Sequence, residues 1–158
     1  MTDSASLACE AHAWPLLRVW TDGGCRPNPG FGAWGFLVRT EAGRKIPRTG
    51  TEEDTTNNRM EMTAILRAFE AATGPRRFIV HTDSAYLLGG MTRHLPIWKA
   101  RRGRKANGKP VENWDLWLAL DAAASRHQHE WRWVEGHGAD VENNEVDALV
   151  TAALRRGA

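Results

Sequence analysis

Apolar and polar residues alternate along residues 16–24, and this period of two predicts a β-strand. Four further short segments are interpreted as strands, at 33–39, 45–51, 78–82 and 130–134. Only turn-forming residues, at 25–30 and 41–44, separate the first three strands. These three strands are therefore expected to form an antiparallel meander.

After residue 58 the apolar spacing changes to that of a helix. Thr55, Thr56 or Asn57 can cap this helix, and Thr73-Gly74-Pro75 ends it. Its apolar face consists of Met60, Ala64, Leu66, Ala68 and Ala71. Further helices are predicted at 84–90, closed by a Gly-Gly pair, from Asn113 or Asp115 to about 126, and at 141–156. The order β-β-β-α-β-α-α-β-α predicts an α/β fold with two parallel strands added beside the first.

The chain has 158 residues, enough for one domain with a substantial core but too few for two. Residues 16–156 are expected to form this domain, and the small, polar residues 1–15 a flexible tail. No apolar run reaches the ~18 residues of a membrane span, and no secretion signal is recognised. Two cysteines form no disulfide framework or zinc motif. We therefore expect a cytoplasmic monomer with no membrane association and no obligate protein partner.

Four acidic residues stand where their carboxylates can converge. Asp22 and Asp83 each follow an apolar strand, and if these strands are parallel neighbours both side chains emerge at one edge of the sheet. Glu61 and Asp147 lie on helices that can pack across the sheet towards that edge. Each acid alone is consistent with a solvated surface residue, and Asp22-Gly23 with a simple turn. Converging carboxylates without lysine partners would repel one another, so the set predicts an oxygen-preferring divalent metal.

Each of these acids lies in a short motif. The motifs are Thr21-Asp22-Gly23-Gly24-Cys25 with Asn28-Pro29-Gly30, Thr56-Asn57-Asn58-Arg59-Met60-Glu61, Thr82-Asp83-Ser84, and Glu135-Gly136-His137 followed by Glu142-Asn143 and Asp147. In this order and spacing, over residues 16–156, they resemble type 1 ribonuclease H of the bacterial type. The resemblance implies a ribonuclease H-like fold, which is a five-stranded mixed sheet with helices on both faces.

The resemblance also implies an activity. It implies an endonuclease that hydrolyses the RNA strand of RNA–DNA hybrids without strict sequence specificity, leaving 5′-phosphate and 3′-hydroxyl ends. The four acids would hold two Mg²⁺ ions during catalysis, for which Mn²⁺ can substitute. Glu61 would also meet the ribose 2′-hydroxyl. His137 would assist proton movement or product departure, and Asn143 would orient a water molecule or that histidine.

Between Asp83 and Glu112 the chain carries basic residues but no acid. The basic residues are Arg93, Lys99, Arg101, Arg102, Arg104, Lys105 and Lys109. They predict a basic protrusion at about 93–109, similar to the handle with which some family members grip hybrids; a merely solvated loop is the alternative. Such a handle would bind phosphates and make binding salt-sensitive.

Further substrate contacts are implied by the matching family positions. They are Gly23, Asn28, Thr56, Asn57, Asn58, Trp98, Asn113, Trp117 and Asn143. Trp98 and Trp117 would face the DNA strand, and Thr56 and Asn113 would hold a DNA phosphate. Asn28, Asn57 and Asn58 would form hydrogen bonds in the minor groove.

At four positions the chain departs from the family pattern. Asp54 stands where an arginine of the phosphate pocket is common, Ala85 where a glutamine is common, and His94 and Gly103 where the handle often carries tryptophan. These changes concern binding rather than the acids, so we predict retained chemistry with altered affinity. A non-catalytic hybrid-binding module and a DNA nuclease of the same fold remain alternatives, whereas a nucleotide-binding protein lacks its P-loop.

Overall fold

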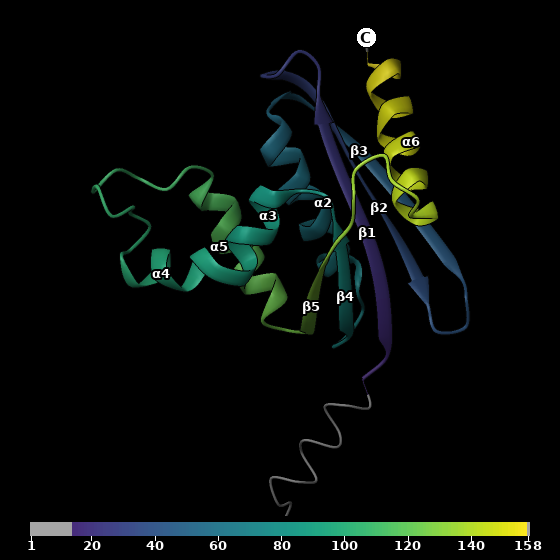
Figure 1. The fold of residues 1–158 in the computed structure, drawn as a ribbon, viewed down its shortest axis with the longest axis horizontal. Helices are drawn as coiled ribbons and strands as arrows, with labels where there is room; N and C mark the ends of the chain where they lie inside the picture. The colour runs from purple at the N-terminus through teal and green to yellow at the C-terminus, as the bar shows by residue number, and fades with distance from the viewer. Residues whose placement is uncertain (1–13, 158) are drawn as a thin grey trace, which may run out of the picture.

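The computed structural model describes residues 14–157, in which helices cover both faces of a five-stranded sheet (Figure 1). The strands are β1 (Leu16–Cys25), β2 (Gly30–Thr40), β3 (Lys45–Thr55), β4 (Arg77–Thr82) and β5 (Gln128–Trp133). They lie in the order β3-β2-β1-β4-β5, with antiparallel pairing from β3 to β1 and parallel pairing from β1 to β5. The predicted mixed sheet is confirmed, and β1 is its central strand.

The helical segments are α2 (Asn57–Ala71), α3 (Ala85–Gly89), the π-helical turn η1 (Gly90–His94), α4 (Leu95–Ala100), α5 (Trp114–Ala124) and α6 (Val141–Arg156). At the start of α2, Thr56 Oγ1 accepts a hydrogen bond from the Arg59 backbone N–H at 3.2 Å, so the predicted cap is present. The bounds of α6 are those predicted from the sequence. Ala71, expected on the apolar face of α2, is instead exposed at its last position.

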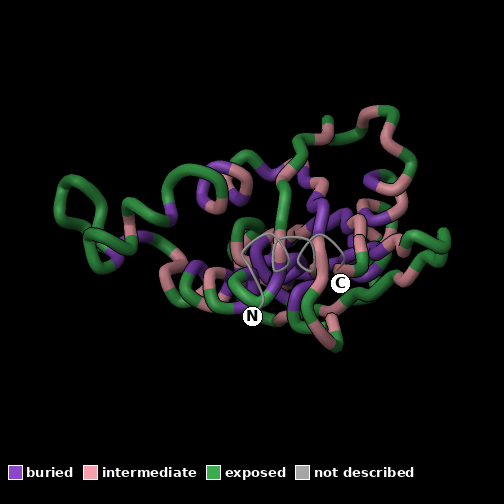
Figure 2. Tube along the Cα trace, turned by 90° about the horizontal axis from the view of Figure 1, so that it is seen from below, coloured by how far each residue is buried: buried purple, intermediate pink, exposed green. Residues whose placement is uncertain are grey.

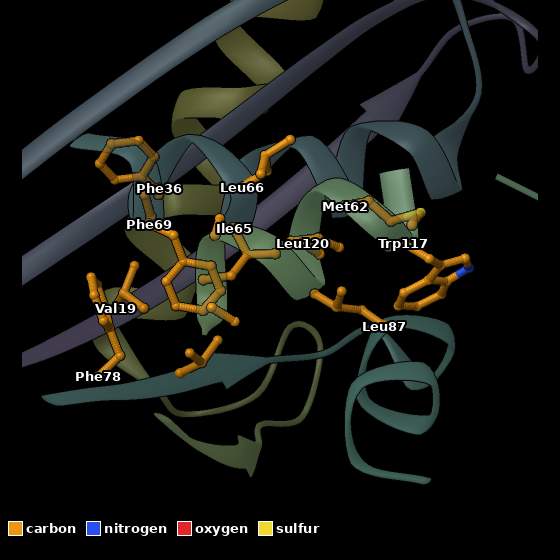
Figure 3. Packing of buried hydrophobic residues seen from close by; sticks show 14 of the residues in the cluster. Val19, Phe36, Met62, Ile65, Leu66, Phe69, Phe78, Leu87, Trp117 and Leu120 are labelled. Atoms are coloured by element: carbon orange, nitrogen blue, oxygen red, sulfur yellow. The ribbon is translucent and has the colours of Figure 1, made fainter. Parts of the chain in front are cut away.

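Two apolar clusters hold the helices against the sheet. The larger packs α2, α3 and α5 on one face, where Phe69, Phe78 and Trp117 are fully buried (Figure 3). The smaller packs α6 on the other face, where Trp20 of β1 meets Val146 and Val150. Because side chains of a strand alternate between its faces, β1 supplies both clusters. The central strand is thereby fixed on both sides.

The predicted helix at 84–90 is present as α3, which ends at Gly89, but the Gly89-Gly90 pair does not stop the helical path. The chain continues through η1 into α4, and Gly90 has a right-handed helical conformation with φ −61°. A Cβ atom at Gly90 would overlap the Trp117 ring, so this glycine permits close packing on α5. Three consecutive helical segments, α3, η1 and α4, therefore follow β4.

The chain between α4 and α5 extends away from the body and is mostly exposed (Figures 1 and 2). Most of the predicted tail, residues 1–13, lies outside the described residues. Pro15 already belongs to the fold, because its carbonyl accepts a hydrogen bond from the Arg77 N–H at 2.9 Å. In the part of the chain described, no helix has the length and apolar character needed to cross a membrane.

Candidate metal centre and substrate surface

Three predicted acids meet at the edge where β1 and β4 run side by side. The parallel register pairs Trp20 with His81, so Asp22 and Asp83 follow this pair two residues later on adjacent strands. Glu61 comes from the first turns of α2. One carboxylate oxygen from each of these three acids lies within 4.8 Å of the others. The structure therefore brings together acids that are up to 61 residues apart in the sequence.

Gly23 brings α2 to the acids. A Cβ atom at this position would overlap the backbone of Met60 and Glu61. The absence of a side chain at Gly23 allows the start of α2 to lie directly on β1, which places the Glu61 carboxylate beside Asp22. Gly23, predicted to contact substrate, thus has a clear role in packing.

The carboxylates of the centre are protonated unusually easily. Burial first, and then the charges of Asp83 and Asp147, raise the pKa of Asp22 to about 8. Burial, followed by the charges of Asp22 and Asp83, raises the pKa of Glu61 well above its usual value. The pKa of Asp83 is also raised, chiefly by burial.

Within the described part of the chain, these carboxylates also lack lysine or arginine partners. Glu61 Oε2 is buried without a hydrogen bond. Among residues 14–157, no lysine or arginine forms an ion pair with Asp22, Glu61 or Asp83. A donor set of buried, mutually repelling carboxylate oxygens fits a hard divalent cation.

Asp147 and His137 lie at the open side of this group. Asp147, on α6, raises the pKa of Asp22 by its charge and by a side-chain hydrogen bond, so it is adjacent to Asp22. It is not among the three acids whose oxygens lie within 4.8 Å of one another. His137 Nδ1 lies 3.9 Å from Asp147 Oδ2, and the histidine side chain is 86% exposed. The imidazole therefore lies in solvent beside the carboxylates.

Asn143 is placed to support the centre. It is 2% exposed. Its backbone N–H donates to Asp140 Oδ1 at 2.8 Å, and its side-chain Nδ2 donates to the Glu135 carbonyl at 3.5 Å. A side-chain hydrogen bond from Asn143 also lowers the pKa of Asp83, opposing the effect of burial. Asn143 thus links α6 to the 134–140 loop and influences Asp83, while its contact with substrate stays a prediction.

A shallow groove of about 540 Å³ gathers many of the predicted substrate residues. It is lined by Asn28, Pro29, Thr56, Asn57, Asn58, Glu112 and Asn113. Arg59, which the sequence reasoning passed over within a recognised motif, supports its wall. Arg59 Nη1 donates to Asn113 Oδ1 at 3.2 Å and pairs with Asp115, while Asn113 Nδ2 donates to the Tyr86 hydroxyl at 3.0 Å.

The two tryptophans predicted to face DNA differ in exposure. Trp117 has no exposed surface and its Nε1 donates to the Tyr86 hydroxyl at 3.3 Å, so the prediction that it contacts substrate is not met here. Trp98 is half-buried and lies between the rings of His94 and Trp117, with centroids 5.4 and 5.5 Å away. His94, one of the four departures from the family pattern, thus stacks on the partly exposed ring of Trp98.

The predicted basic protrusion is an exposed loop closed by backbone contacts. Its side chains Arg101, Arg102, Arg104 and Lys105 are exposed. The Val111 N–H donates to the Gly103 carbonyl at 2.9 Å and thereby closes the loop. A Cβ atom at Gly103 would overlap the Trp114 ring, which explains why no tryptophan stands there.

The fold and this centre define an α/β domain that can hold a divalent metal among carboxylates from the ends of two parallel strands and from helix α2, with Asp147 of α6 adjacent. A family model described as RNase H matches residues 16–155. The chain therefore belongs to the ribonuclease H family, and the resemblance predicted from the motifs is confirmed.

Individual relatives agree with this assignment. The chain is 49% identical over 138 residues to a protein named ribonuclease H from Acidiphilium cryptum, covering 87% of this chain and 86% of the relative. It is 46% identical over 138 residues to a ribonuclease H of Bordetella pertussis, with 87% and 88% covered. Among solved structures it is similar to LC9-RNase H1, a type 1 RNase H with the type 2 active-site motif. This similarity has a TM-score of 0.77 at 34% identity and covers 89% of this chain and 72% of that one.

Proposed function

We propose that this protein is an endonuclease that hydrolyses the RNA strand of RNA–DNA hybrids and leaves 5′-phosphate and 3′-hydroxyl ends. The observation that carries the proposal is the group of three carboxylates, one buried and two half-buried, within 4.8 Å of one another in a chain of the ribonuclease H family. The predicted absence of strict sequence specificity is retained, because phosphate contacts by an exposed basic loop carry no base information.

Asp22, Glu61, Asp83 and Asp147 would hold the metal, for which we propose Mg²⁺, with two ions during catalysis and Mn²⁺ as a substitute. Such ions supply activation of the attacking water and charge stabilisation at the leaving oxygen. The unpartnered, buried Glu61 carboxylate supports this assignment. His137, exposed beside Asp147, is assigned to proton transfer or product release.

The remaining residues would position the hybrid. The exposed Asn57 and Asn58 face the groove beside the start of α2, and Trp98 offers a partly exposed ring at the base of the protrusion. Arg101, Arg102, Arg104 and Lys105 would bind phosphates. A single domain at 16–156, a monomeric state and a cytoplasmic location stay predictions from the sequence.

The test is cleavage of end-labelled RNA–DNA hybrid, RNA duplex, DNA duplex and single-stranded RNA, with Mg²⁺ and with chelator. The proposal predicts cleavage of RNA in the hybrid alone, and none with chelator. Cleavage of the DNA duplex would instead establish the DNA nuclease alternative. Hybrid binding without cleavage would establish the binding module and overturn the proposed function.

A further inference from the structure

A stacked aromatic pair lies next to the carboxylates on the same face of the sheet. Trp20 and Asp22 are two residues apart on β1 and therefore share a face, and His81 occupies the matching position before Asp83. The Trp20 and His81 rings are nearly parallel, with centroids 4.5 Å apart and an interplanar angle of 8°. This pair joins the two strands that carry Asp22 and Asp83.

Arg39 of β2 connects this pair to α6. Its guanidinium carbon lies 5.3 Å from the centroid of the Trp20 ring, a cation–π geometry. Its Nη1 donates to Glu142 Oε1 at 2.7 Å, and the Glu142 side chain is only 15% exposed. A side chain stacked on β1 thus holds a carboxylate of α6 that is 103 residues away in the sequence.

The residue that Arg39 holds lies in the first turn of α6. Glu142 is followed immediately by Asn143, which is 2% exposed and whose side chain lowers the pKa of Asp83, and five residues later by Asp147, which raises the pKa of Asp22. A helix is rigid over so short a length, about 7.5 Å for five residues. A shift of the first turn of α6 would therefore move Asn143 and Asp147 together, away from the acids on the sheet.

We propose that Arg39 is a positioning residue of the metal centre, and that its ion pair with Glu142 fixes the start of α6 so that Asp147 stays beside Asp22. This inference rests on the proposed function, because it assigns Asp147 to the metal site. Within residues 14–157, Arg39 forms an ion pair with Glu142 and with none of the four acids. It acts on the centre through α6.

The test compares Arg39→Met, Glu142→Gln and their combination. Each single variant is expected to lower kcat on the hybrid roughly 10-fold, as for residues that orient metal ligands, with KM for hybrid nearly unchanged. The Mg²⁺ concentration for half-maximal binding, measured by calorimetry, is expected to rise. Glu142 also lies 4.0 Å from Lys45 Nζ, so Glu142→Gln removes both of its cationic partners. The double variant should therefore lose no more than Glu142→Gln alone.

A readout without metal or substrate separates this proposal from the proposed function. In metal-free protein, hydrogen exchange of the backbone amides at 143–147 should accelerate in Arg39→Met and Glu142→Gln. Arg67→Met is the matched control, because it breaks an exposed ion pair with Glu70 on α2 and should change none of these values. Arg39→Lys, which keeps the positive charge, is measured as well, in case Arg39→Met fails to fold.

Two results would overturn the role of Arg39. One is unchanged Mg²⁺ affinity and unchanged exchange at 143–147 in Arg39→Met. The other is strictly additive losses in the double variant. Absence of hybrid cleavage by the unmodified protein would refute the proposed function instead, while the exchange experiment would still decide whether Arg39 fixes α6.

Discussion

Asp22→Asn is expected to stabilise the metal-free protein at neutral pH. Asp22 is 8% exposed, and burial together with the charges of Asp83 and Asp147 raises its pKa to about 8. A carboxyl whose pKa is raised in the folded state contributes stability that is fully present below its unfolded value of 3.8. That contribution is lost as the pH rises from 3.8 through about 8. The neutral amide keeps the shape and avoids this loss.

The magnitude follows from the size of the shift. A pH of 7 lies about three units above the unfolded pKa of Asp22, and each unit corresponds to about 1.36 kcal/mol. The stability lost by pH 7 is therefore at most about 4 kcal/mol. Asp83 and Glu61 share the same repulsion, so the expected gain for Asp22→Asn is roughly 2–4 kcal/mol. For a domain of this size that corresponds to a Tm increase of roughly 5–15 °C.

The assay is thermal unfolding in chelator at several values between pH 4 and pH 8. The Tm advantage of Asp22→Asn over the unmodified protein should be small at pH 4 and should grow towards pH 8. Glu53→Gln, which removes one exposed negative charge from β3, is the matched control and should show no such growth. A variant that is less stable than the parent at pH 8, or an advantage independent of pH, would refute the reasoning. Added Mg²⁺ should stabilise the parent more than the variant.

The remaining predictions concern substrate binding and proton transfer. Glu112→Gln should lower KM for hybrid two- to threefold at low salt and have little effect at high salt, because it removes a negative charge from the groove beside Thr56. Arg102→Ala with Lys105→Ala should weaken hybrid binding and reduce the slope of log affinity against log salt by about 2, measured by fluorescence anisotropy. His137→Ala should lower kcat without raising KM in steady-state kinetics, because the side chain is 86% exposed and its Nδ1 lies 3.9 Å from Asp147 Oδ2.

The positions of the acids could be predicted because each follows from a local pattern. Asp22 and Asp83 follow apolar runs, and the parallel pairing of the runs brings their ends together. Glu61 and Asp147 lie on helices whose starts are marked by the caps Thr56 and Asp140. Strand ends and helix caps depend on residues that are close in the sequence, so the sequence alone is enough to predict them.

The contacts that the sequence did not reveal depend on residues far apart in the chain. Gly90 looked like the end of a helix, and only the burial of Trp117 against it explains why the helix continues. Trp117 itself was assigned to the surface by its motif, although its ring fills the core under α3. The pairing of Arg39 with Glu142 spans 103 residues, and no local pattern predicts it.

The central claim is that the carboxylates at the ends of β1 and β4 hold the metal that drives cleavage of RNA in a hybrid. The most direct measurement is single-turnover cleavage of a hybrid, with each strand labelled in turn, over a titration of Mg²⁺. We expect the unmodified protein to cut only the RNA strand. The variants Asp22→Asn and Asp83→Asn should bind the hybrid without cutting it. Cleavage by either variant at the rate of the unmodified protein, or cleavage that persists in chelator, would contradict this claim.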